Sequence, residues 1–350
     1  MSPAPAVVVL PEDLSSFITR LFAKAGASDD HAASLAEVMT WASVRGIDTH
    51  GTGLVPTYLK FVGNGVANLS PEVSVRKTGA VSVLEADRAP GPVALTLAAD
   101  LAIDEARESG VSAVGVRRSV HTGAIGYYVN RIAEAGLIGI GFVAGMPNMG
   151  YTGVKGAAVA TSPLAVAVPS ATHGIVLLDM ATATIAMGRI KQAKASGTPL
   201  PVGAAATADG VPTTDPQLAE MPLPLGGAKG SGMSLTFELL TSVLLGSPIL
   251  AEFHTGTGEG KKHRQNALLI ALDPAAFGSA DDFPAAVDAT IEALKGLPVA
   301  EGAEGIYVPG ERSSAVAAAR TSGGVPIGAK AWKALTDAAD EHGVDLPPVQ

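Results

Sequence analysis

Apolar residues recur at helical spacing through the first part of the chain. A helix is predicted to begin at Pro11, because proline suits the first helical position, and to end at Gly26, where glycine commonly terminates a helix. A second helix is predicted from the cap at Ser28 to Gly46. Residues 55–62 are expected to add one or two further turns. The pattern therefore predicts a helical lobe at the start of the chain.

From residue 73 onward, short strand-like runs alternate with helices. Strands are predicted at 81–86, 112–116, 137–143, 158–161, 164–168, 175–180 and 267–272, and helices at 93–109, 125–135, 231–245, 285–295, 313–318 and 329–342. The connections within 158–180 are shorter than the crossover that parallel neighbours need, which favours antiparallel pairing. The expected fold class is α/β, close to α+β, with a mixed, largely antiparallel sheet rather than a doubly wound parallel one.

Two segments differ from this alternation. Residues 194–217 are polar and rich in turn-forming residues, which predicts an excursion over the surface. The helix expected at 231–245 is strongly apolar, so we expect it to be largely buried.

Composition narrows the class of protein. At 350 residues the chain exceeds what one hydrophobic core usually fills, so two lobes are expected. A net charge of −9 without a basic stripe argues against nucleic acid or a membrane surface as a partner. Cysteine is absent, which excludes disulfides, thiolate nucleophiles and cysteine-bound metal. No secretory signal or membrane-spanning run is recognised, so a cytoplasmic protein is expected.

Two histidines in glycine-containing segments are the first candidates for chemistry. His50 stands in Thr49-His50-Gly51, where the second helix must end. Imidazole exchanges a proton near neutral pH, the Thr49 hydroxyl can fix its tautomer, and the glycine leaves room for a ligand. The alternative is that histidine and glycine only terminate the helix. Together with His121, His50 predicts proton chemistry at a site assembled from distant parts of the sequence.

His121 precedes Thr122-Gly123-Ala124, after a predicted strand and before a predicted helix. Backbone amides at the start of a helix bind phosphate, so this run is a candidate for cofactor contact. The spacing is not that of the dinucleotide-binding fingerprint, and close packing of helix on strand would explain the glycines equally well.

Lys229 and Asp179 are further candidates. Lys229 lies between glycines in PLGGAKGSG, and although the spacing is not that of a Walker loop, it suits an anionic or carbonyl-bearing ligand. The alternative is a plain surface loop. Asp179 ends a strand and is expected to bind ribose hydroxyls or to cap the helix that begins near Ala183. Asp48 and His50 are the one close acid–imidazole pair in a candidate segment, so no metal site is expected.

These segments together resemble the malate/L-lactate dehydrogenase family of the second type, which includes ureidoglycolate and sulfolactate dehydrogenases and cyclic imino-acid reductases. The resemblance is carried in order by RGIDTHG with Tyr58, HTGAIGYY, ATSPLAVAVP, LLDMAT with GRI, DGVPTTDP, PLGGAKGSG and YVPGER. It implies a homodimer with a nonclassical NAD(P)-binding domain on a mixed sheet. It also implies a dehydrogenase that transfers hydride between NAD(H) or NADP(H) and C2 of a small-molecule substrate, a 2-oxo or 2-hydroxy acid.

Two alternative functions accompany this expectation. One is a reductase of an imino acid or of another unusual C=N or C=O substrate. The other is a cofactor-binding protein without activity, against which the presence of both His50 and His121 argues.

The pattern and the resemblance together predict three regions. Residues 1–72 form a helical lobe that carries His50, residues 73–310 a cofactor-binding domain on the mixed sheet, and residues 311–350 C-terminal helices that return to the first lobe.

The resemblance also implies roles for individual residues. His50 and His121 correspond to the catalytic histidines, with Thr49 where the family usually has serine. Arg45, Leu54 and Thr161 are expected at the substrate. The expected cofactor contacts are Thr122, Gly123, Ala124, Asp179, Met180, Ala181, Lys229, Pro309, Gly310 and Glu311.

The chain departs from the family pattern at the substrate. Leu54 stands where many members have an arginine that grips the substrate carboxylate. Val120 and Ser162 stand where asparagine is usual, and the segment 204–207 lacks a common tryptophan and aspartate. The candidate replacements for the missing arginine are Arg45, Lys229 and Arg189. We therefore expect a bulkier and more apolar substrate than pyruvate or oxaloacetate.

Overall fold

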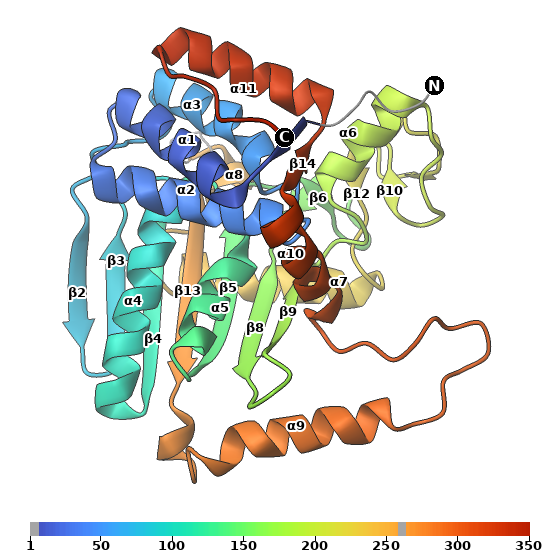
Figure 1. The fold of residues 1–350 in the computed structure, drawn as a ribbon. Coiled ribbons are helices and arrows are strands. Elements are labelled where there is room, and N and C mark those ends of the chain that lie inside the picture. Colours follow the sequence, from blue (N-terminus) through green and yellow to red (C-terminus); the bar gives the residue numbers. More distant parts are fainter. Residues whose placement is uncertain (1–6, 258–263) are drawn as a thin grey trace.

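A seven-stranded mixed sheet forms the centre of the protein in the computed structural model, which describes residues 7–257 and 264–350 (Figure 1). Its strands, in spatial order, are β2 (Ser74–Thr78), β3 (Val81–Glu85), β4 (Val111–Ser119), β13 (Gln265–Leu272), β5 (Ile138–Gly145), β8 (Leu164–Pro169) and β9 (Ile175–Met180). Only β3 and β4 pair in parallel; every other neighbouring pair in this sheet is antiparallel. The expected fold class, with a mixed and largely antiparallel sheet, is confirmed.

Helices cover both faces of this sheet. α4 (Gly91–Ser109) and α5 (Ile125–Glu134) pack on one face, where Val114 and Val116 of β4 are buried. Gly115, between them, points to the other face and meets Leu245, beyond the π-helical turn η2 (Leu239–Val243) that continues α7 (Ala228–Glu238). Alternate side chains of a strand point to opposite faces, so β4 contributes to both layers.

The remaining helices of the two chain ends pack together above the sheet. α1 (Pro11–Lys24), α2 (Asp29–Val44) and α3 (Val55–Gly63) lie beside α11 (Ala329–His342), and α10 (Glu311–Gly323) contacts α2 (Figure 1). β1 (Val7–Val9) pairs antiparallel with β14 (Val325–Ile327), which ties the two ends of the described chain together. The apolar faces of α1 and α2 therefore form part of one large core.

Smaller elements surround the sheet. They are η1 (Thr52–Leu54), α6 (Met187–Ser196), α8 (Leu250–Thr255), η3 (Pro274–Ala276) and α9 (Asp282–Lys295), with the short strands β6 (Met149–Gly150), β7 (Ala157–Val159), β10 (Ala205–Ala206), β11 (Pro212–Thr213) and β12 (Met221–Pro222). The strand predicted at 158–161 is β7, which pairs with β6 and not with β8, so its expected place beside β8 was wrong. The segment 194–217, predicted as a surface excursion, contains β10 and β11, which form a small sheet with β12 just beyond it.

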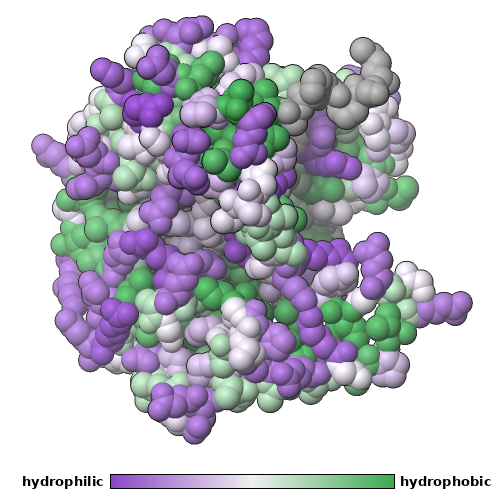
Figure 2. Space-filling model, viewed as in Figure 1, coloured by the Kyte–Doolittle hydropathy of each residue, from purple (hydrophilic) through white to green (hydrophobic). Residues whose placement is uncertain are grey.

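The apolar helix predicted at 231–245 is not largely buried. Five of its apolar residues are between 38% and 64% exposed, and we call this surface the α7 face: Leu235, Leu239, Leu240, Val243 and Leu244. The helical period predicted an apolar element correctly, but packing on the sheet uses only one side of it. Figure 2, in the same view as Figure 1, shows further apolar residues scattered among polar ones. Leu297 and Val299, which follow α9, are also exposed.

No helix within 7–257 or 264–350 is long and apolar enough to cross a membrane.

Candidate active site

The structure brings the two candidate histidines together. His50 lies between α2 and η1, and His121 lies between β4 and α5. Their ring centroids are 5.8 Å apart and their ring planes differ by 17°, so the rings lie face to face. Two residues that are 71 positions apart in the sequence thus lie side by side in the fold.

The His50 segment is held by short-range contacts. The Thr49 hydroxyl oxygen lies 3.0 Å from His50 Nδ1, which supports the predicted pairing of hydroxyl and imidazole. Burial lowers the pKa of His50, because the charged imidazolium is poorly solvated there. Gly51 has a different role from the one expected, since a side chain there would begin 2.1 Å from Ser43 Oγ. The glycine permits close packing within the protein and does not make room for a ligand.

The His121 segment is fixed on three sides. Tyr58 donates a hydrogen bond of 2.6 Å to the His121 carbonyl oxygen, and the Thr122 amide donates one of the same length to Gln265. Gly91, at the start of α4, packs so closely that a side chain would begin 2.3 Å from Thr122 Cα. These contacts fix the position of the imidazole before any ligand binds.

The expected phosphate cradle at 122–124 is not formed by its first two amides. The Thr122 amide is bonded to Gln265, and the Gly123 amide points at His121 Nδ1, 3.3 Å away. Thr122, Gly123 and Ala124 are buried. Their small size lets α5 begin close to the end of β4, which was the alternative explanation of the glycine.

Asp179 faces the same region from the end of β9. Its carboxylate accepts the Gly126 amide at 3.0 Å, so it caps the start of α5 and not a helix near Ala183. The carboxylate is reached by solvent but is crowded by protein atoms, and this desolvation raises its pKa to about 6, opposed by the Gly126 hydrogen bond. A capping carboxylate with an exposed edge can also accept a hydrogen bond from a ligand.

Four further candidates, Thr161, Met180, Ala181 and Lys229, lie at or next to the end of β9. Thr161 accepts the Thr182 amide through its carbonyl oxygen at 3.1 Å, which places it beside Met180 and Ala181. Gly230 packs against Thr182, where an added side chain would begin 2.5 Å from the carbonyl oxygen. Lys229, in the first turn of α7, is therefore near the same strand end, and its side chain is exposed.

The segment 309–311 lies beside Leu177 of β9, two residues before Asp179. The Pro309 carbonyl oxygen accepts the Leu177 amide at 3.0 Å, and Gly310, with a positive φ of 88°, packs directly on Leu177. Glu311 forms an ion pair with Lys295, which lowers the pKa of its carboxyl. Pro309 and Gly310 are thus beside β9, whereas Glu311 is engaged in fastening α9 to α10.

The candidates for the missing arginine differ in position. Arg45 donates to Ser313 and Ser314 of α10 and stacks over Trp41, so its guanidinium is used in packing and is not directed to the histidines. Arg189 is in the first turn of α6, next to Gly188, where a side chain would begin 3.4 Å from Thr49 Cγ2. Leu54 is half-buried and packs against the main core. The Arg189 side chain donates to Gln192 of the same helix at 3.2 Å, while its backbone lies beside the His50 segment.

Several contacts of the site were not assigned from the sequence. Tyr58 was part of the recognised motif but had no role, and Gln265 and Gly91 gave no signal, because their partners are distant in sequence. Arg320 of α10 forms an ion pair with Asp48 at 2.7 Å and bonds to the Ser43 carbonyl oxygen, which anchors the His50 segment.

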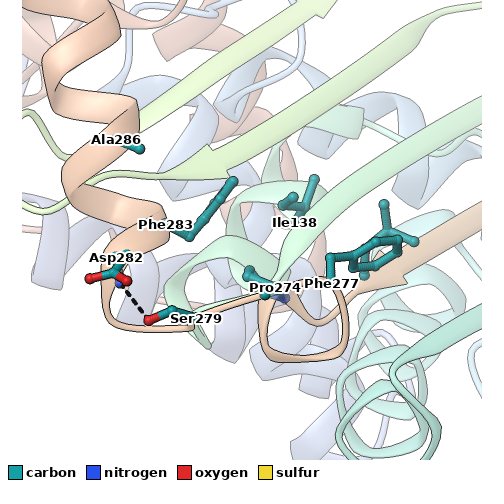
Figure 3. Close-up of a pocket in the computed structure, with 9 residues that line it drawn as sticks. Ile138, Pro274, Phe277, Ser279, Asp282, Phe283 and Ala286 are labelled. Carbon is teal, nitrogen blue, oxygen red and sulfur yellow. Dashed lines mark hydrogen bonds between the residues drawn. The ribbon is translucent and has the colours of Figure 1, made fainter.

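An apolar cavity of about 420 Å³ lies elsewhere, at the beginning of α9 (Figure 3). Ile138 and Leu272 line it from the sheet, and Phe277 and Phe283 from the chain before and in α9. His121 lies near the other end of β13, roughly 23 Å away at about 3.3 Å per residue. This cavity is separate from the histidine site.

Comparison with known proteins gives consistent matches along the chain. A family model described as malate/L-lactate dehydrogenase matches residues 9–336. Ureidoglycolate dehydrogenase (NAD(+)) of Escherichia coli (strain K12) is 34% identical over 308 residues, which cover 86% of each chain. Malate/(S)-sulfolactate dehydrogenase of Methanothermus fervidus is 29% identical, over 97% of this chain and 99% of the relative.

Solved structures agree with these matches. Sulfolactate dehydrogenase from Methanocaldococcus jannaschii superposes with a TM-score of 0.88 at 31% identity, over 97% of this chain and 98% of that one. A delta1-piperideine-2-carboxylate reductase from Pseudomonas syringae pvar. tomato gives a TM-score of 0.85 at 29% identity, over 95% and 99%.

Asp179 gives a prediction about stability and pH. Its pKa in the folded protein is about 6, above the ordinary value of 3.8, so the unfolded chain loses its proton first as pH rises. Stability is then lost between about pH 4 and pH 6. Asp179→Asn cannot ionise and keeps an oxygen for the Gly126 amide. We expect it to raise the melting temperature at pH 7 and to have little effect below pH 4, with Asp104→Asn, an exposed acid of α4, as control. If the melting temperatures of Asp179→Asn and the unmodified protein differ by the same amount at pH 4 and at pH 7, the raised pKa of Asp179 is contradicted.

Proposed function

Because this chain belongs to the malate/L-lactate dehydrogenase family, we propose that the facing pair His50 and His121 carries the proton step of its reaction. The protein is an NAD(P)-dependent oxidoreductase that transfers hydride between the nicotinamide and C2 of a 2-oxo or 2-hydroxy acid. The observation that supports the site most directly is the 5.8 Å separation of the two imidazoles. Both rings come from segments that the fold holds rigidly.

The residues at the end of β9 fit a dinucleotide. The Asp179 carboxylate suits ribose hydroxyls, and the exposed Lys229 at the start of α7 suits a phosphate charge. Gly310 and Gly126 keep side chains away from this strand end. When bound, the nicotinamide supplies or accepts the hydride, and the protein positions the substrate and handles the proton. We also propose that the protein acts in the cytoplasm.

The substrate is proposed to be bulkier and more apolar than pyruvate. Leu54 presents an aliphatic surface where the family usually has a guanidinium, which would bind a carboxylate through two charge-assisted hydrogen bonds. Arg189 is proposed to supply the remaining positive charge from α6, beside Thr49. The fold likeness to a cyclic imino-acid reductase makes a cyclic imine the second candidate substrate.

The histidines can be tested by substitution. We expect His50→Ala and His121→Ala each to lower kcat by about 10²–10⁴-fold, which is the usual contribution of a positioned acid or base. The affinity for NADH or NADPH, measured by thermal shift and fluorescence titration, should change much less. Activity is measured as loss of NAD(P)H absorbance against a panel of 2-oxo acids and cyclic imines. A variant that retains near-normal kcat would show that its histidine is structural.

Leu54 tests the substrate class. We expect Leu54→Arg to lower KM for pyruvate and oxaloacetate relative to the best substrate of the unmodified protein. The reason is that the introduced guanidinium can bind the substrate carboxylate through two hydrogen bonds. Leu54→Met is the control, since it keeps volume and lacks charge. Efficient turnover of pyruvate by the unmodified protein would contradict the proposed preference.

We also propose that two copies associate through the α7 face. Five exposed aliphatic side chains on one helical segment form an apolar surface of the kind that marks an interface, and the family resemblance implies a homodimer. We expect a dimer in sedimentation velocity, and we expect Leu244→Asp, at a residue that is 64% exposed, to shift it toward monomer. Val202→Asp, at an exposed valine elsewhere, should remain dimeric. A monomeric unmodified protein would rule out this interface.

A further inference from the structure

Tyr58 is buried beside His121, and its hydroxyl contacts both the backbone and the ring of that histidine. Its hydroxyl oxygen lies 2.6 Å from the His121 carbonyl oxygen and 3.1 Å from His121 Nδ1. One oxygen thus bridges the backbone and the ring of the same residue. The rings of Tyr58 and His121 meet edge to face, with centroids 5.8 Å apart, so the bridge also fixes the ring orientation.

The single hydroxyl proton decides what the bridge does. A carbonyl oxygen can only accept, so the 2.6 Å contact takes the Tyr58 proton. The lone pairs of the same oxygen then remain for Nδ1 at 3.1 Å, and they require Nδ1 to carry a hydrogen. Burial raises the pKa of Tyr58 well above its ordinary value, so the phenol keeps its proton and does not exchange it with substrate.

The Gly123 amide is the competing group. It donates toward Nδ1 at 3.3 Å, and an amide cannot accept in return. If this contact prevailed, Nδ1 would carry the lone pair and Nε2 the hydrogen. The two arrangements exclude each other, because one nitrogen cannot both hold a hydrogen and accept one. The Tyr58 contact is the shorter of the two and therefore the stronger candidate.

We propose that Tyr58 is a positioning residue that holds neutral His121 with its hydrogen on Nδ1, so that Nε2 is the nitrogen that takes the proton of the substrate. This inference rests on the proposed function and assigns the proton step within it. On oxidation, the C2 hydroxyl proton passes to Nε2, the C2 hydride passes to the oxidised nicotinamide, and C2=O forms. Reduction returns the same proton and hydride.

The bridge serves both protonation states of the ring. Nδ1 keeps its hydrogen and its Tyr58 contact whether or not Nε2 is protonated, so the imidazole does not need to turn during the reaction. A hydrogen bond from the Gly123 amide to Nδ1 would instead be lost when the ring becomes protonated, because Nδ1 would then carry a hydrogen. A fixed orientation in both states is what a general acid and base requires.

The test compares two buried tyrosines. Tyr128 also donates a 2.6 Å hydrogen bond to a carbonyl oxygen, that of Thr122, so Tyr128→Phe is the matched control for Tyr58→Phe. Proteins labelled with ¹⁵N-histidine are studied by NMR without substrate, and His121→Gln assigns the signals. We expect a protonated Nδ1 and an unprotonated Nε2 in the unmodified protein and in Tyr128→Phe. In Tyr58→Phe the hydrogen should move to Nε2, because Gly123 then determines the tautomer.

The kinetic measurement adds a second readout. Tyr58→Phe should lower kcat by about 10–100-fold, the usual effect of removing the partner that orients a histidine, with KM little changed. A hydrogen on Nε2 in the unmodified protein, or an unchanged tautomer in Tyr58→Phe, would overturn the proposal. The NMR measurement needs neither substrate nor cofactor, so it tests the His121 tautomer independently of activity. An absence of activity on the whole substrate panel would refute the proposed function and would not affect the tautomer result.

Discussion

The antiparallel pairing of β13 with both β4 and β5 is the interaction on which the site depends. β4 leads into His121, and the strands beyond β5 lead to Asp179, so the strand between them sets the distance from imidazole to carboxylate. At its first residue, Gln265, the side chain also holds the Thr122 amide. One strand from late in the sequence therefore orders two parts of the site, and its backbone ladder resists any independent movement of either part.

The sequence was sufficient wherever structure is local. The helices around 93–109 and 125–135 and the hairpin of β8 and β9 follow from period and turn length, and both histidines were found through their motifs. The pairing of β7 with β6 and the exposure of Leu244 depend on contacts with segments that are distant in sequence. The local pattern of apolar and polar residues does not encode such contacts. Tyr58 and Gln265 act on His121 from 63 and 144 positions away in numbering, so their roles emerged only in three dimensions.

Helix α10 joins the two halves of the candidate site. Its first residues rest on β9, where Gly310 meets Leu177, and its far end holds the His50 segment through Arg320 and Asp48. The arginine that the sequence suggested for substrate, Arg45, also belongs to this attachment. The end of β9 and the segment that carries His50 are thereby both in contact with one helix.

The pairing of β1 with β14 has a consequence for the order of synthesis on the ribosome. Val9 pairs with Val325, and His50 depends on contacts from α10, so an early part of the protein waits for a late part before it is complete. β2, β3 and β4 can pair as they emerge, whereas β4 and β5 are joined only by the late strand β13. The segment that carries His50 gains its anchor later still, after residue 320 has left the tunnel. A nascent chain of this protein therefore lacks the Arg320 anchor of the His50 segment for nearly the whole of its translation.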